Sequence, residues 1–245
     1  MRNMLLSFIL LISVCSTVSS AQEIPFMEMA GKNYADCTRE ITDVYSYFFQ
    51  LDTIEMQKVV SQFEEFVQTT GSLEWRLQTD YFTFTLLRKK NSACTSNEMV
   101  QQALDLLERL QKAKMYPLEV KLRHDLIGIY QHEVNNYELA LEQCDTQAQR
   151  LRTVSVDEIP EKVFYDIQIA RMYYDFKDYL KAITHCKIIL NDKDNWFSQW
   201  YKQEALNVMG LSYRYGFNDL DRSDSCFYAI LNTTYNSSNS ERDRY

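Results

Sequence analysis

The stretch NYELALEQC at 136–144 and the stretch DYLKAITHC at 178–186 share one pattern and lie 42 residues apart. Tyrosine, alanine and cysteine recur together at the second, fifth and ninth positions of both stretches. A third, weaker copy starts at Asp219 and includes Ser223 and Phe227, 41 residues after Ala182 and Cys186 of the second copy. A period of roughly twenty to fifty residues is typical of stacked repeats. The sequence therefore predicts an array of repeated units.

A second segment repeats in front of each copy. It covers Ile127 to Tyr130 in the first unit, Ile169 to Tyr173 in the second and Met209 to Tyr213 in the third. The apolar residues in these segments recur at helical spacing, as they do in the stretches that follow. Each unit is therefore predicted to be a pair of helices.

The composition points to the same fold class. The chain has 245 residues but only 5 Gly and 3 Pro. Tight β-hairpins, phosphate-binding loops and dinucleotide folds all need glycine at positions of positive φ or close backbone approach. We therefore expect an all-α protein, an α-solenoid of antiparallel helix hairpins.

Apolar periodicity, proline at first turns and polar breaks predict ten helices in five consecutive hairpins. Divergent hairpins are expected in 34–114 and regular repeats in 115–232. Pro117 and Pro160 are expected at helix starts, and Gly210 at a close helix contact. The predicted helices are Tyr34–Gln50, Thr53–Thr69, Leu73–Lys90, Glu98–Lys114, Leu118–His132, Tyr137–Arg152, Glu161–Asp175, Tyr179–Leu190, Phe197–Tyr215 and Asp221–Leu231.

These residues resemble the tetratricopeptide repeat (TPR) family from Leu118 to Leu231. The match is best at Ile169-Ala170, Tyr173-Tyr174, Tyr179, Ala182-Ile183 and Ile189-Leu190. Small residues there allow two helices to approach closely while large ones fill the space beside them. Two departures are Asp166 where the family has a bulky residue, and a period longer than the usual 34 residues. The resemblance implies an open groove lined by the first helix of each hairpin.

The N-terminus has the pattern of a signal peptide. Arg2 precedes an apolar run from Met4 to Val14, and cleavage is expected after Ala21. Lipidation at Cys15 is the alternative. Residues 22–33 would then form a linker, and no later run is long enough to span a membrane. We expect an exported protein of the periplasm or cell envelope.

Charge and motifs limit the chemistry that the chain can perform. The formal net charge is −8, and it is −9 after loss of residues 1–21. An acidic chain is not expected to bind nucleic acid directly. The basic run 88–90 is interpreted as a solvated helix end. His124, His132 and His185 show no metal-binding spacing, and no nucleophile–base motif is present, so we expect no cofactor, no metal and no enzyme activity.

The cysteines of the mature chain are Cys37, Cys94, Cys144, Cys186 and Cys226. Because Cys144 and Cys186 occupy the same place in successive hairpins, they are expected to be about 10 Å or more apart. A disulfide tolerates roughly 7 Å between α-carbons. They are therefore predicted to be core thiols, while pairing of Cys37 with Cys94 stays open.

Candidate groove residues follow from the TPR resemblance, position by position. They are mostly polar, in keeping with a groove that faces water, although ordinary solvated helix faces would look the same. The candidates are Lys121, His124, Gln131, His132, Arg171, Tyr174, Asp175, Glu204, Asn207 and Arg214.

After the last predicted helix, residues 233–245 are a polar tail without a capping helix. The last hairpin, with Cys226, Phe227, Ile230 and Leu231, would be covered by the tail, by self-association or by further repeats. A truncated chain is one interpretation. Exported arrays of this kind resemble the sensor halves of Bacteroidetes-type envelope regulators.

Three functions remain open. The first is a non-catalytic scaffold of the bacterial envelope that binds a protein or peptide along the groove. The alternative is the periplasmic sensor region of a membrane-anchored helix-turn-helix regulator, truncated here. The third is an all-helical enzyme or a glycan-binding protein.

Overall fold

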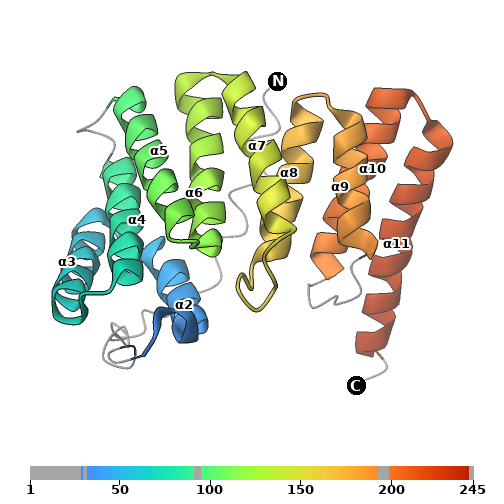
Figure 1. Cartoon of the computed structure of the whole chain (residues 1–245). Helices are drawn as coiled ribbons and strands as arrows, with labels where there is room; N and C mark the ends of the chain where they lie inside the picture. The colour runs from blue at the N-terminus through green and yellow to red at the C-terminus, as the bar shows by residue number, and fades with distance from the viewer. Residues whose placement is uncertain (1–28, 30–31, 91–94, 192–198, 243–245) are drawn as a thin grey trace.

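The structure is a computed structural model that describes residues 29, 32–90, 95–191 and 199–242, with only the backbone for residues 38, 39 and 233–242. Within these ranges all regular structure is helical, as predicted (Figure 1). The elements are η1 (Tyr34–Cys37), α2 (Thr38–Phe48), α3 (Thr53–Thr70), α4 (Leu73–Lys90), α5 (Ser96–Lys112), α6 (Tyr116–Ile129), η2 (Tyr130–Val134), α7 (Tyr137–Leu151), α8 (Lys162–Asp175), α9 (Tyr179–Asn191), α10 (Gln199–Phe217) and α11 (Leu220–Arg242).

The helix ends are set by local side chains. The Asp52 side chain accepts hydrogen bonds from two backbone N–H groups at the start of α3, and Gly71 ends this helix with a φ of 66°. Thr95 and Glu98 form a capping box at the start of α5. Such caps satisfy N–H groups that have no partner within the helix. Pro117 lies in the first turn of α6, as predicted, whereas Pro160 lies just before α8.

The turn within each C-terminal hairpin is itself repeated. Asn135, Lys177 and Asn218 follow η2, α8 and α10, and all three have a positive φ. The next residue in each case, namely Asn136, Asp178 or Asp219, accepts a hydrogen bond from the backbone N–H three residues later. The left-handed residue ends one helix and the side chain caps the next. The period seen in the sequence therefore reflects a turn that forms in the same way three times.

The repeat also places the same small residues in the core. Ala140, Ala182 and Ser223 are fully buried, and Cys144 and Cys186 are free and fully buried. Burial raises the pKa of both thiols to about 12. The prediction of core thiols at these two positions is therefore confirmed.

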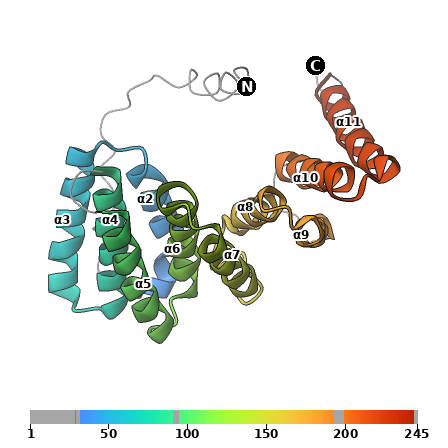
Figure 2. The ribbon, with the colours of Figure 1, turned by 90° about the horizontal axis from the view of Figure 1, so that it is seen from above.

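The hairpins form a bent row. Figure 2 shows α6, α8 and α10 along one side and α5, α7 and α9 along the other. We call the side formed by α4, α6, α8 and α10 the inner face, because the row bends toward it. The pairs α4–α5, α6–α7, α8–α9 and α10–α11 pack as hairpins.

The first predicted hairpin is not formed. Helix α3 packs on α4, with the Phe63 ring 5.1 Å from the Phe82 ring, while α2 is not packed along α3. Instead α2 lies on the inner face beside α4 and α6 (Figure 2). Phe48 of α2 is fully buried, and its ring lies 4.6 Å from that of Phe82. Both helices thus pack aromatic side chains against the same residue of α4, Phe82.

The C-terminal end differs from the prediction. Helix α11 continues to Arg242, past Leu231, so most of the expected polar tail continues the last helix. The predicted close contact at Gly210 is confirmed, because a Cβ atom there would lie 3.1 Å from the Phe227 ring and 3.2 Å from Cys226. No helix among the described residues is both long and apolar enough to cross a membrane.

Some predictions lie outside the described residues. These are the signal peptide at 1–21, lipidation at Cys15, most of the linker and the tail end at 243–245. Cys94 also lies outside, so its pairing with Cys37 stays a prediction.

Candidate functional site

The inner face is partly covered by the chain's own helix α2. The Tyr45 ring stacks on Tyr81 of α4, with centroids 5.8 Å apart and planes 13° apart. The Tyr45 hydroxyl lies 2.7 Å from the Tyr81 hydroxyl and also hydrogen-bonds Tyr165 of α8. The Lys121 ammonium of α6 lies 4.0 Å from the centroid of the Tyr45 ring. One residue of α2 therefore contacts three successive inner helices.

These side chains form what we call the tyrosine cluster: Tyr45, Tyr81, Tyr165 and Asp125. Tyr81 donates a hydrogen bond of 2.8 Å to Asp125, which also accepts one of 2.9 Å from Arg88. Burial raises the pKa of all three phenols, and the Asp125 carboxylate raises them further. The phenols thus stay neutral and act as hydrogen-bond donors to one another and to the carboxylate.

Lys121 does not face water, contrary to the prediction. Its side chain is buried and forms an ion pair of 2.7 Å with Glu161. Burial lowers its pKa, and Glu161 partly restores it. The Tyr45 ring of α2 covers Lys121, so this part of the inner face is not open. Lys121 therefore joins α6 to α8 beneath α2.

Two cavities open on the inner face beyond the C-terminal end of α2. The first, which we call the inner cavity, has a volume of about 260 Å³ and lies between α4, α6 and α8. The second, the Phe49 cavity, has a volume of about 400 Å³ and is lined by Phe49, Thr85, Arg88, Lys89, Asp125 and Glu133. Arg88 and Asp125 line both, so the two cavities adjoin.

Three predicted groove residues line the inner cavity: His124, Gln131 and His132. His124 packs edge-to-face on Phe164 at 5.6 Å and on Tyr165 at 5.4 Å. Burial and the nearby Arg88 lower its pKa to about 4, so the imidazole is neutral at pH 7.

Gln131 and His132 lie in the π-helical segment η2. Such segments insert an extra residue into a helix and are frequent at functional sites. The predicted helix Leu118–His132 gives no sign of this change in winding. Its effect is to place the half-buried Gln131 and the exposed His132 at the edge of the inner cavity.

Arg171 and Glu204 form an ion pair between α8 and α10. The Arg171 guanidinium also lies 5.9 Å from the centroid of the Trp200 ring, and Trp200 is 48% exposed. Both predicted residues therefore lie together between α8 and α10, beside an exposed aromatic side chain. This ion pair and Trp200 extend the candidate surface from α8 to α10.

The other four predicted groove residues are not brought into either cavity. Tyr174 packs edge-to-face on Tyr179 at 5.7 Å, near the turn between α8 and α9. Asp175 and Arg214 are exposed near the ends of α8 and α10, and Asn207 is half-buried in α10. Their role in binding stays a prediction.

The roles of Arg88 and Asp125 are not indicated by the sequence. The run 88–90 is not simply a solvated helix end, because Arg88 pairs with Asp125 at 2.9 Å and with Glu133 at 3.4 Å. Lys89 donates hydrogen bonds to the backbone carbonyls of Phe49 and Leu51, at the end of α2. The hydrogen bond from Lys89 to Phe49 joins residues 40 positions apart, so the sequence around either residue does not indicate it.

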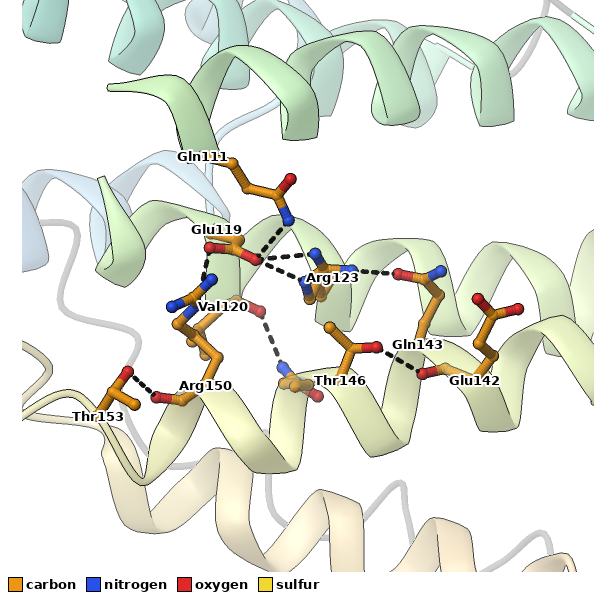
Figure 3. Close-up of polar contacts among 10 residues, drawn as sticks. Gln111, Glu119, Val120, Arg123, Glu142, Gln143, Thr146, Arg150 and Thr153 are labelled. Atoms are coloured by element: carbon orange, nitrogen blue, oxygen red, sulfur yellow. Dashed lines mark hydrogen bonds and ion pairs between the residues drawn. The ribbon is translucent and has the colours of Figure 1, made fainter. Parts of the chain in front are cut away.

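A second polar cluster lies inside the array rather than on its inner face. Figure 3 shows Glu119 between Gln111, Arg123 and Arg150, which come from α5, α6 and α7. Glu119 is fully buried and pairs with Arg123 at 2.8 Å and with Arg150 at 2.9 Å. Gln111 donates a further hydrogen bond of 3.1 Å. This cluster holds three helices together and has no open cavity beside it among those described above.

Asp166, which departs from the TPR pattern, lies 3.0 Å from the buried His185 of α9. This polar contact joins α8 to α9, the two helices of this hairpin. Within the described ranges, no group of three or more His, Cys, Asp or Glu side chains is arranged to hold a metal ion.

Comparison with known proteins supports the fold. No family model matches the sequence, and no curated protein matches it. The structure is similar to BtubC (BKLC) from P. vanneervenii, with a TM-score of 0.60 and 10% identity over 83% of this chain and 82% of that chain.

It is also similar to a putative kinesin light chain from Podosopora anserina with nearly identical TPR-like repeats. The TM-score is 0.55 at 12% identity, over 84% of this chain and 98% of that chain. A variant of that protein with one substituted residue gives a TM-score of 0.56 at 12% identity, over 84% and 99% of the two chains. At this identity the likeness shows the fold alone, which is that of a TPR-like helical repeat.

Proposed function

We propose that this chain is a non-catalytic scaffold that binds a peptide or protein segment along its inner face. The observation that carries the proposal is the pair of adjoining cavities at Arg88, which lie on the side of the array toward which the hairpins bend. An open concave surface of a helical repeat suits an extended partner. The surface continues past these cavities to Arg171, Glu204 and the exposed Trp200.

The site of action is proposed to be the bacterial cell envelope, after removal of residues 1–21. This part of the proposal is supported only by the signal-like sequence, with Arg2, the apolar run and the small residues before Gln22. It is tested by sequencing the N-terminus of the protein recovered from its native host. An N-terminus at Gln22 is expected, and an intact Met1 would contradict it.

Binding is tested with peptides selected from a random library on the wild-type protein, with affinity measured by fluorescence anisotropy. Arg171→Glu and Arg214→Glu reverse charges on the inner side, at α8 and α10. Lys187→Glu makes the same change at an exposed position of α9, on the other side of the row. Loss of binding in the first two variants and retention in the third is expected. Equal binding by all three would contradict the proposal.

A further inference from the structure

Helix α2 lies on the inner face in the way that a bound helix lies in a groove. Ile41, Val44 and Phe48 are its buried apolar side chains. Tyr45, between them, contacts α4 and α6. The four residues occupy positions i, i+3, i+4 and i+7, which are the anchor positions of an amphipathic helix bound in a groove. Asp43, on the opposite side of α2, is exposed.

We propose that α2 is a built-in ligand of the inner face, and that an amphipathic helix of a partner protein takes its place. The partner helix carries apolar side chains at positions i and i+3, tyrosine at i+4 and phenylalanine at i+7, as α2 does. This goes beyond the proposed function, which uses only the part of the inner face that α2 leaves open. The stretch beneath α2 is then a second part of the binding surface, closed by an autoinhibitory contact.

The contacts that hold α2 on the array come from side chains. Among the described residues, no hydrogen bond between backbone groups joins α2 to another hairpin. Its C-terminal end is held by Lys89 of α4, which donates hydrogen bonds to the carbonyls of Phe49 and Leu51. Residues 49–52 then lead to α3, along which α2 is not packed. Release of α2 therefore leaves the backbone hydrogen bonds of the repeats intact.

The polar groups beneath α2 also have partners within the array itself. Tyr81 donates a hydrogen bond of 2.8 Å to Asp125, which accepts another from Arg88. Lys121 pairs with Glu161 at 2.7 Å. None of these bonds involves α2, so they persist when the helix leaves. Buried polar groups without partners are costly, and a surface that satisfies its own polar groups is therefore suited to bind a helix reversibly.

The aromatic anchors define which helix fits. The Tyr45 ring stacks on Tyr81 and lies 4.0 Å from the Lys121 ammonium, while its hydroxyl lies 2.7 Å from that of Tyr81. The Phe48 ring packs at 4.6 Å on Phe82. Phenylalanine at the Tyr45 position would keep the stacking but lose the hydrogen bonds. The site therefore selects tyrosine followed three residues later by phenylalanine.

Covalent attachment gives α2 an advantage over a helix from another chain. A segment tethered by a short connection has an effective concentration in the millimolar range. A partner helix must overcome this competition, so it binds tightly only when α2 is loosened. Lys89 acts at the tethered end, outside the stretch that Tyr45 and Phe48 occupy, and is therefore the residue through which the competition is best tested.

The probe is a fluorescein-labelled synthetic peptide with the sequence of residues 38–51, and its binding to the full chain is measured by fluorescence anisotropy. Lys89→Met removes the hydrogen bonds to the end of α2. It should bind the probe at least tenfold more tightly than the wild type, because one hydrogen bond from a charged donor corresponds to about tenfold or more. Lys90→Met removes the hydrogen bond of 3.0 Å from the neighbouring lysine to Gln57 of α3 and should keep the wild-type affinity.

Two further measurements show that the probe takes the place of α2. A peptide with Tyr45→Ala and Phe48→Ala lacks both aromatic anchors and should not bind to the Lys89→Met chain. Hydrogen exchange, followed by mass spectrometry with a ¹⁵N-labelled probe, should become faster in the α2 segment of the chain when the probe binds. Exchange in α10 should not change. In addition, Phe48→Ala in the chain loosens α2 within the site and should strengthen binding of the probe; if this variant does not fold, the two lysine variants still decide.

The outcomes that would overturn the inference are distinct from those that test the proposed function. They are no binding of the probe to Lys89→Met, equal affinity of Lys89→Met and Lys90→Met, equal binding of the doubly substituted peptide, and binding without faster exchange in α2. A dimer of Lys89→Met chains without the probe would assign the site to a second copy and overturn the partner helix. If library peptides still depend on Arg171 while the probe fails, the groove function stands and the built-in ligand falls.

Discussion

The hydroxyl of Tyr45 lies 2.7 Å from the hydroxyl of Tyr81, and this contact fixes α2 across the inner face of the repeat array. Tyr45 comes from the helix that would otherwise pair with α3, whereas Tyr81 belongs to the first helix of the next hairpin. The contact therefore closes one part of the face. It leaves the stretch beyond Phe49 open, where the two cavities lie.

The tyrosine contact should contribute to the stability of the fold. Tyr45→Phe removes one buried hydroxyl and is expected to lower the free energy of unfolding by about 1–2 kcal/mol. Tyr45→Ala also removes the ring and should cost about 3–5 kcal/mol. Urea denaturation measures both. Tyr47→Phe, at a half-buried position of the same helix, is the matched control. If Tyr45→Ala costs no more than that control, α2 is not anchored as described.

The buried carboxylate of Glu119 should stabilise the fold, because it balances the charges of both of its arginine partners. Glu119→Gln leaves Arg123 and Arg150 without their counter-charge, and removing one partner of a buried ion pair costs about 3–5 kcal/mol. The free energy of unfolding should fall by that amount. Glu138→Gln, exposed on α7, should change it by less than about 0.5 kcal/mol. Similar values for both variants would show that the cluster adds nothing to stability.

Two glycines offer a test of helix packing with a built-in control. Alanine at Gly210 would meet Phe227 and Cys226 at 3.1–3.2 Å, whereas alanine at Gly128 meets only the flexible Arg88 tip at 3.3 Å. Both substitutions gain the same helix propensity, about 1 kcal/mol. Gly210→Ala should therefore be less stable than Gly128→Ala by about 1–3 kcal/mol, the usual cost of overpacking. Thermal unfolding of the two variants measures this difference, and a reversed order would contradict the close contact of α10 with α11.

His124 should make stability depend on pH. Its folded pKa is about 4, below the ordinary value of 6.5, because of burial and of Arg88. Between these values the unfolded chain binds a proton that the folded chain does not. The free energy of unfolding should therefore fall as pH falls from 6.5 toward 4, by up to about 1.4 kcal/mol per pH unit from this group.

The variant His124→Gln checks this assignment. It should show a shallower slope of unfolding free energy between pH 6.5 and 4 than the wild type. Gln131→Ala, at a residue that does not titrate and lines the same cavity, is the control and should keep the wild-type slope. A wild-type slope in His124→Gln would mean that other groups cause the pH dependence.

The C-terminal repeats could be predicted from the sequence because their determinants are local. Ala140, Ala182 and Ser223 recur at the period and are all fully buried. Left-handed Asn135, Lys177 and Asn218, each followed by a capping side chain, set the same turn three times. Such signals act over a few residues, so periodicity reveals them. Most helix bounds therefore agree with the prediction within a few residues.

The inner face could be predicted only in part, because α2 reaches it through contacts distant in sequence. Lys121 was expected to face water, but it lies beneath Tyr45 and beside Glu161. Arg88 and Asp125 are 37 positions apart and acquire their role only when α4 lies beside α6. The π-helical winding of η2 is likewise not indicated by the apolar spacing from which the helix Leu118–His132 is predicted.

Peptides are expected to bind on the inner face, next to the end of α2. A crystal structure of the full chain with a selected peptide tests it most directly. We expect electron density along α6, α8 and α10 that begins near Phe49 and places a side chain in the inner cavity between Gly128 and Met172. Density along α5, α7 and α9 instead, with the inner cavity unchanged, would contradict the account.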